Sequence, residues 1–178
     1  MNQSHLLKLL EHFNLGQLVH EPQRVHGGLL HIMWHIDTSN GSYAVKQLSK
    51  NINLNDEKVV RNYELTECIA HQFANKGIPA VYAISKNGKH LFIVDNSGYL
   101  LYPWIDAKVL GQDAINQTRA LEIACILAKI HLINLNLNDL DEPEFDIHSN
   151  QSLMELVDLA ERKKVVFSDY LQNNLNNL

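Results

Sequence analysis

Cysteine is scarce in this chain, and its two cysteines, Cys68 and Cys125, both fall inside segments with helical patterning. Nothing in the sequence pairs them into a disulfide framework, and no cysteine–histidine pair has a zinc-ligand spacing. His31 and His35 are the most suggestive metal-binding pair, but four residues along a strand span about 13 Å, too far to share one ion. We therefore expect reduced thiols, a cytoplasmic setting and no metal site.

Long apolar runs and clustered positive charge are also lacking. No run approaches the roughly 18 residues of a membrane helix, and the start, MNQSHLLKLLEHF, has no basic leader followed by an apolar core. The net charge is -5 without a basic stripe, which argues against nucleic-acid binding, because phosphate contacts need clustered lysine and arginine. The 178 residues, 46% hydrophobic and 20% charged, fit a soluble globular protein of one domain or two small lobes.

The predicted elements change in kind along the chain. A short amphipathic helix over residues 4–13, with Ser4 as its N-cap, is followed by strands, one long helix and more strands. The strands are predicted at residues 17–25, 29–38, 42–48, 80–85, 90–95 and 99–104, and the later helices at 54–76, 114–134 and 152–174. Only helices are predicted after residue 106, so the order indicates an α+β fold with a boundary there.

Turn residues punctuate these elements. The dipeptides Asn40-Gly41 and Asn87-Gly88 predict tight hairpin turns, because both residues tolerate positive φ angles. Asn55 or Asp56 lies near the start of the long helix, and Gly77 is its expected stop.

One lysine stands in an unusual place. In the predicted strand GSYAVKQL, Lys46 shares a face with Ala44, and the pattern marks that face as buried. Kinases hold ATP with elements in a fixed order: a Gly-bearing turn, two paired strands with a lysine in the second, and then a helix. This chain has that order, with the turn at Gly27 and Gly28. The alternative is that Lys46 lies at a strand edge and extends its ammonium into water.

The long helix offers a partner for this lysine. Its apolar stripe on a helical wheel consists of Val59, Val60, Tyr63, Ala70, Phe73 and Ala74. Glu67 falls inside the stripe and Glu64 lies at its edge. A buried carboxylate and a buried ammonium offset each other's desolvation if they meet. We therefore predict Glu67 as the partner of Lys46, with Glu64 as one alternative and a solvent-facing Glu67 as the other.

Three segments, GGLLHIMWHIDTSNGSYAVKQL, RNYELTECIAHQFANKGIPA and YLLYPWIDAKVL, resemble in order and spacing the N-terminal lobe of the aminoglycoside phosphotransferase and choline kinase family. The resemblance covers residues 17–135 and implies a small-molecule kinase with a protein-kinase-like fold. Residues 1–105 would form a lobe of antiparallel strands with one long helix, ending in a hinge. Residues 106–178 would form part of a helical lobe, whose first helix the segment LAKIH resembles.

The resemblance also implies roles for single residues at the phosphate end of an ATP site. Gly27 and Gly28 match the loop that covers the phosphates. Lys46 matches the lysine that binds them, and Glu67 matches the helix glutamate that holds this lysine.

At the adenine end, Ala44 matches the small residue that lies over the base. The segment LLYPWIDA matches the hinge, where the C=O of Pro103 and the N–H of Ile105 would hold adenine. Proline suits the first position because only its carbonyl is used. The alternative is that Pro103 and Trp104 form an ordinary strand end with an apolar plug.

The family's catalytic loop, an H-x-D-x-x-x-x-N pattern, is not found in residues 135–178. Asp169 and Asn174 have the right mutual spacing, but Phe167 stands where the histidine belongs and the segment reads as one continuous helix. We therefore assign no catalytic residue and no metal ligand.

We accordingly expect the N-terminal portion of an ATP-dependent small-molecule phosphotransferase, inactive or nearly so by itself. Mg²⁺ would bind with ATP only if the missing residues were supplied, and a small-molecule acceptor would bind in the complete family. The alternative is a non-catalytic nucleotide-binding or protein-interaction module, whose predicted C-terminal helices would expose apolar faces and favour self-association.

Overall fold

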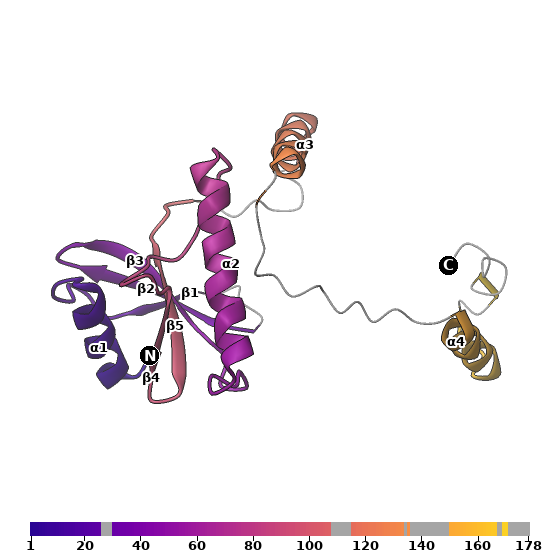
Figure 1. The fold of residues 1–178 in the computed structure, drawn as a ribbon, viewed down its shortest axis with the longest axis horizontal. Coiled ribbons are helices and arrows are strands. Elements are labelled where there is room, and N and C mark those ends of the chain that lie inside the picture. The colour runs from indigo at the N-terminus through magenta and orange to yellow at the C-terminus, as the bar shows by residue number, and fades with distance from the viewer. Residues whose placement is uncertain (26–29, 108–114, 134, 136–149, 167–168, 171–178) are drawn as a thin grey trace. The chain divides into compact units, whose positions relative to one another are not determined.

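A computed structural model describes residues 1–25, 30–107, 115–133, 135, 150–166 and 169–170. The chain divides into two compact units, Met1–Asn138 and Asp139–Leu178. The first unit contains α1 (Gln3–Phe13), β1 (Gln23–Val25), β2 (Ile32–Thr38), β3 (Gly41–Gln47), α2 (Glu57–Asn75), β4 (Leu91–Val94), β5 (Ser97–Pro103) and α3 (Gln117–Leu132), and the second contains α4 (Asn150–Arg162) (Figure 1). The predicted α+β class, an antiparallel sheet with one long helix followed by helices, is confirmed.

The five strands form one antiparallel sheet in the order β1-β2-β3-β5-β4. Two hairpins, β2–β3 and β4–β5, are joined by the pairing of β3 with β5, so strands far apart in sequence are neighbours at the centre. In this register Lys46 lies opposite Met33 on β2 and Leu100 on β5, and Ala44 lies opposite Tyr102.

Each face of the sheet carries its own apolar cluster, because successive strand residues point to opposite faces. On one face α1 packs with Leu6, Leu9 and Leu10 against β2, β3 and β5, and Ile36, Val45 and Leu101 there are fully buried. On the other face Leu100 packs with Val60 of the long helix α2. Figure 1 shows α1 and α2 on opposite sides of the sheet. Lys46 alternates with Val45, so it lies on the α2 face.

Helix α2 ends within one residue of the predicted end at residue 76, but it begins three residues after the predicted start at residue 54. Asp56 is its N-cap and accepts a hydrogen bond from the N–H of Lys58 at 2.9 Å. Gly77, which follows the C-cap residue, has a φ of 81°, a left-handed conformation that glycine adopts without strain. Asn87 and Gly88, with φ angles of 53° and 75°, form the tight turn expected of their dipeptide.

Two predicted helix details are wrong. Asn2, not Ser4, caps α1, since its side-chain oxygen accepts from the N–H of Ser4 at 2.9 Å. Helix α4 ends at Arg162 instead of continuing to residue 174, and Lys164 beyond it has a φ of 52°. That left-handed backbone ends the helix even though no glycine or proline marks the place.

One predicted strand is also absent. Residues 80–85 run beside β5 without forming a strand, and the N–H of Ile84 donates to the C=O of Leu101 at 2.6 Å. The N–H of Ala83 donates instead to the carboxylate of Glu67 at 2.7 Å. The apolar pattern of residues 80–85 reflects the burial of Ala83 and the packing of Ile84 against the apolar cluster on the α1 face, and not strand pairing. Within the described residues, no helix combines the length and apolar character needed to cross a membrane.

Candidate functional site

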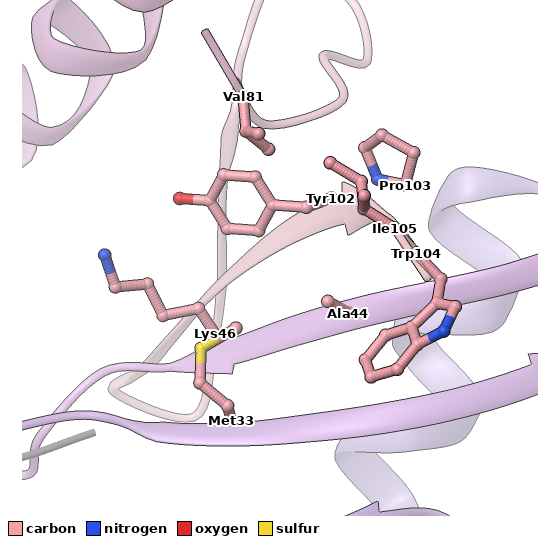
Figure 2. Close-up of a pocket in the computed structure, with 8 residues that line it drawn as sticks. All are labelled: Met33, Ala44, Lys46, Val81, Tyr102, Pro103, Trp104 and Ile105. Carbon is pink, nitrogen blue, oxygen red and sulfur yellow. The ribbon is translucent and has the colours of Figure 1, made fainter. Parts of the chain in front are cut away.

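A pocket of about 310 Å³ opens on the α2 face of the sheet, where β3 passes the end of β5 (Figure 2). Its lining residues are Met33, Ala44, Lys46, Val81, Tyr102, Pro103, Trp104 and Ile105. Four residues singled out from the sequence, Ala44, Lys46, Pro103 and Ile105, are therefore brought together. Gly27 and Gly28, which were predicted to form the loop that covers the phosphates of ATP, lie outside the described residues.

The hydrogen-bonding pattern between β3 and β5 determines the direction of the backbone carbonyl of Pro103 at the edge of the pocket. The N–H of Trp104 donates to the C=O of Ser42 on β3 at 3.1 Å, so these two residues form a hydrogen-bonded pair. Hydrogen-bonded and non-bonded pairs alternate in an antiparallel ladder. Pro103 is the neighbouring position, and its C=O therefore points away from β3. Leu101, two residues earlier, directs its C=O the same way and accepts from Ile84. The Pro103 carbonyl thus lies on the side of β5 where residues 80–84 run.

Three residues, Val81, Trp104 and Ile105, make an apolar wall at the end of the pocket near Pro103, and all three are exposed. The Trp104 indole stacks on the His35 imidazole, with ring centroids 3.9 Å apart and planes at 27°. His35 Nε2 lies 3.3 Å from an oxygen of Asp37, but in a geometry that makes no hydrogen bond. The stack orients a flat apolar ring beside Ala44, which faces His35 across β2 and β3.

Lys46 is half-buried and lies at the other end of the pocket. Its predicted ion pair with Glu67 is not formed, and Lys46 has no ion pair among the described residues. The carboxylates of Glu67 and Glu64 bind other groups, which are described below. The charge of Lys46 nevertheless affects the pKa of a neighbouring histidine, His31. Burial, and after it the positive charge of Lys46, lowers the pKa of His31 below its ordinary value.

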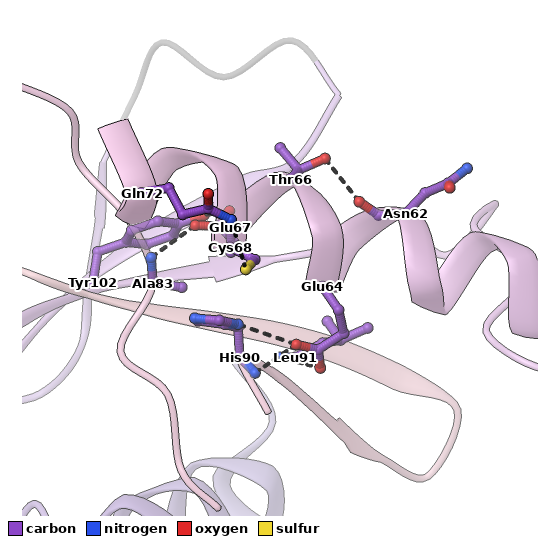
Figure 3. Close-up of polar contacts among 10 residues, drawn as sticks. All are labelled: Asn62, Glu64, Thr66, Glu67, Cys68, Gln72, Ala83, His90, Leu91 and Tyr102. Carbon is purple, nitrogen blue, oxygen red and sulfur yellow. Dashed lines mark hydrogen bonds and ion pairs between the residues drawn. The ribbon is translucent and has the colours of Figure 1, made fainter. Parts of the chain in front are cut away.

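Glu67 is buried, with 6% of its surface exposed, so its predicted position on the inner face of α2 is correct. One carboxylate oxygen accepts from the Ala83 N–H and the other from the Tyr102 hydroxyl, both at 2.7 Å (Figure 3). Burial first, and then the hydrogen bond and charge of Glu67, raises the pKa of Tyr102 well above its ordinary value. The phenol therefore stays protonated and keeps donating.

Glu64 has a different set of partners. It accepts from the backbone N–H of His90 at 2.8 Å and of Leu91 at 3.1 Å, and it meets the His90 ring nitrogen at 3.1 Å. Figure 3 shows it joining α2 to the start of β4. Its role is thus to satisfy backbone groups where a strand begins.

Sequence reasoning missed Tyr102, which both lines the pocket and binds Glu67. The available signal was its alternation with Leu101 along β5, which puts it on the α2 face. Recognising its place beside Ala44 requires the β3–β5 register, which the sequence does not display. Among the described residues, no group of three or more histidine, cysteine, aspartate or glutamate side chains could hold a metal ion.

An antiparallel sheet backed by one long helix and followed by further helices defines the class: a kinase-like N-terminal lobe with a partial helical region. The particular likeness is to a spectinomycin phosphotransferase, APH(9)-Ia, crystallised with ADP and spectinomycin, at a TM-score of 0.61 and 16% identity. At that identity the likeness establishes a shared fold. It covers 98% of this chain and 54% of the other, so this chain spans about half that protein's length. No family model matches the sequence, and no curated protein matches it.

Proposed function

We propose that this chain is the nucleotide-binding portion of an ATP-dependent small-molecule phosphotransferase. Residues 1–105 serve as its sheet lobe and hinge, and residues 106–178 as part of its helical lobe. The observation that carries the proposal is that Ala44 and Lys46 on β3 line one pocket with Pro103, the last residue of β5, and with Ile105 just beyond it. The structural neighbour that shares this fold was crystallised with ADP.

The pocket offers a flat apolar site at one end and a cation at the other. Met33, Ala44 and Val81 supply apolar surface for a planar base, while the Pro103 C=O points away from the ladder and is free to accept from an exocyclic amine. The N–H of Ile105 is the complementary donor. Lys46, with no carboxylate partner among the described residues, supplies positive charge for phosphate oxygens.

Catalysis requires more than this pocket. Phosphoryl transfer depends on metal ions and on a residue that positions the acceptor, and the described residues gather no metal-ligand cluster. We infer that the chain binds nucleotide weakly, gains little from added Mg²⁺ and transfers phosphate only when the residues of the family's catalytic loop are supplied. The acceptor, a small molecule, then binds to that completed lobe.

Calorimetry with ATP and with adenosine tests the proposal. We expect an ATP dissociation constant of tens of micromolar, or about -6 kcal/mol. Lys46→Ala should weaken ATP more than adenosine, because the lysine contacts phosphate and not the base. Lys50→Ala is the matched control, since Lys50 is exposed and lies outside the pocket. Absence of binding of both ligands at millimolar concentration would remove the nucleotide site.

A second candidate, a protein-interaction module, is favoured by helix α3. None of its residues is buried, and Leu121, Ile123, Leu127 and Leu132 are all exposed. Large apolar surfaces of this kind mark interaction sites. We propose that α3 supports self-association, and sedimentation tests this. A monomer at high protein concentration would contradict the candidate without affecting the nucleotide site.

A further inference from the structure

Two contacts hold Trp104 in the apolar wall of the pocket. Its backbone N–H donates to the C=O of Ser42 at 3.1 Å, and its indole stacks on the imidazole of His35, with ring centroids 3.9 Å apart. Ser42 is itself anchored, because its hydroxyl donates to the carboxylate of Asp37. The β2–β3 hairpin thus fixes both the backbone and the ring of a residue that is 37% exposed.

His35 makes this stack in spite of an unfavourable environment for its nitrogen. Its Nε2 atom is buried and has no hydrogen-bond partner among the described residues, although an oxygen of Asp37 lies 3.3 Å away. Buried polar atoms without a partner destabilise a fold and are rare, so each one needs a physical explanation. The stack on Trp104 supplies it, because aromatic rings in an offset stack attract each other. The position therefore uses the flat ring of His35 and not its nitrogen.

The stacked pair lies where the pocket offers its apolar surface. His35 faces Ala44 across β2 and β3, and Met33 lies two residues earlier on the same face of β2. Figure 2 shows the Trp104 indole next to Ala44. A side chain with free rotamers loses that freedom when a ligand packs against it, which weakens binding. For Trp104 the freedom is already lost when the stack forms, before any ligand arrives.

We propose that His35 is a positioning residue that fixes the Trp104 indole as a preformed wall for the flat base of the ligand. The inference deepens the proposed nucleotide site and rests on it for the identity of that ligand. Trp104 and Lys46 line opposite ends of the pocket. His35 therefore determines how tightly the base is held and leaves the attraction for phosphate unchanged.

The fluorescence of Trp104 tests this positioning without any nucleotide. The chain has two tryptophans, so Trp34→Phe leaves Trp104 as the single emitter, and time-resolved anisotropy then reports the motion of its ring. In this background His35→Ala should increase the amplitude of the fast, nanosecond decay by about twofold or more, because the indole loses the ring on which it stacks. His35→Leu, which fills the space without a flat ring, should change the decay in the same direction.

Two further variants make this result specific. His35→Phe keeps a flat ring, removes the nitrogen and should restore the slow decay of the parent protein. His12→Ala removes a different stacked histidine, which lies on α1 against Phe92, and should have no effect. The proposal is overturned if His35→Ala leaves the anisotropy decay unchanged. It is also overturned if His35→Phe behaves like His35→Ala, because a flat ring would then not be what holds the indole.

Ligand affinity supplies a separate readout. His35→Ala should raise the dissociation constants of ATP and adenosine by the same factor, about threefold or more, and leave their ratio unchanged. Lys46→Ala, by contrast, should change the ratio. Unchanged constants, or a loss confined to ATP, would overturn the role of His35 in holding the base. If the wild-type chain binds neither ligand, the proposed function fails, and the anisotropy decays still decide whether His35 fixes Trp104.

Discussion

The two faces of the sheet are built differently. The α1 face is closed: Leu9, Ile36, Val45 and Leu101 are fully buried in a continuous apolar cluster. The α2 face is half open and mixes Leu100 with charged and hydroxyl-bearing side chains that hydrogen-bond across it. Because strand residues alternate, a single strand such as β3 supplies Val45 to the closed face and Lys46 to the open one. The larger buried apolar cluster therefore lies on the α1 face, and the pocket opens on the α2 face.

The largest expected effect is on the closed face. Leu9→Ala removes a fully buried side chain and should lower the free energy of unfolding by about 2–5 kcal/mol. Leu7→Ala, on the exposed side of the same helix, should change it by less than about 0.5 kcal/mol. Urea unfolding measures both. Equal effects would mean that α1 does not pack against the sheet in solution.

A smaller loss of stability is expected on the open face. Glu67→Ala leaves the Ala83 N–H and the Tyr102 hydroxyl without their acceptor and should cost about 1–3 kcal/mol. Glu57→Ala, an exposed carboxylate in the first turn of the same helix, should cost under about 1 kcal/mol. The comparison would fail if both substitutions, followed by chemical unfolding, had the same small effect.

The smallest expected effect concerns protonation beside the pocket. Because its pKa is lowered in the folded state, His31 binds a proton more readily in the unfolded chain. Its contribution to stability is therefore present above its unfolded pKa of 6.5 and is lost as the pH falls below it. Lys46→Met should raise the His31 pKa only part of the way back, because burial is the larger cause. An NMR titration of His31 in both proteins would show this, and an unchanged pKa would place Lys46 far from His31.

The sequence predicted these two faces unequally. The inward position of Glu67 follows from helical periodicity, which is a local property of α2, and the structure confirms it. Its partner was predicted wrongly because Tyr102 reaches it only through the pairing of β3 with β5, a contact between distant parts of the chain. Ser4 was predicted as the cap of α1, but the cap is Asn2, an equally good capping residue two positions earlier.

The roles of single residues in the pocket were predicted separately from the two faces of the sheet. Ala44, Lys46, Pro103 and Ile105 were chosen from a resemblance, and the structure brings them into one pocket, although nucleotide binding by them stays a prediction. The strand expected at residues 80–85 was inferred from apolar residues that are buried for another reason. Ala83 packs beside Leu100 while its N–H goes to a side chain instead of a strand. Periodicity reports burial, and it does not report which hydrogen bonds accompany it.

The position of β5 between β3 and β4 has a consequence for how the chain acquires its structure. The β2–β3 hairpin can form from local sequence. The outer edge of β3 stays unpaired until β5 is available, and β5 is separated from the hairpin by all of α2 and β4. Closing so long a loop costs entropy before any contact compensates for it, and such pairings are formed slowly. During synthesis the centre of the sheet therefore stays incomplete until residue 103 has left the ribosome. The pocket needs both strands and also Trp104 and Ile105, so it cannot form before that stage of synthesis.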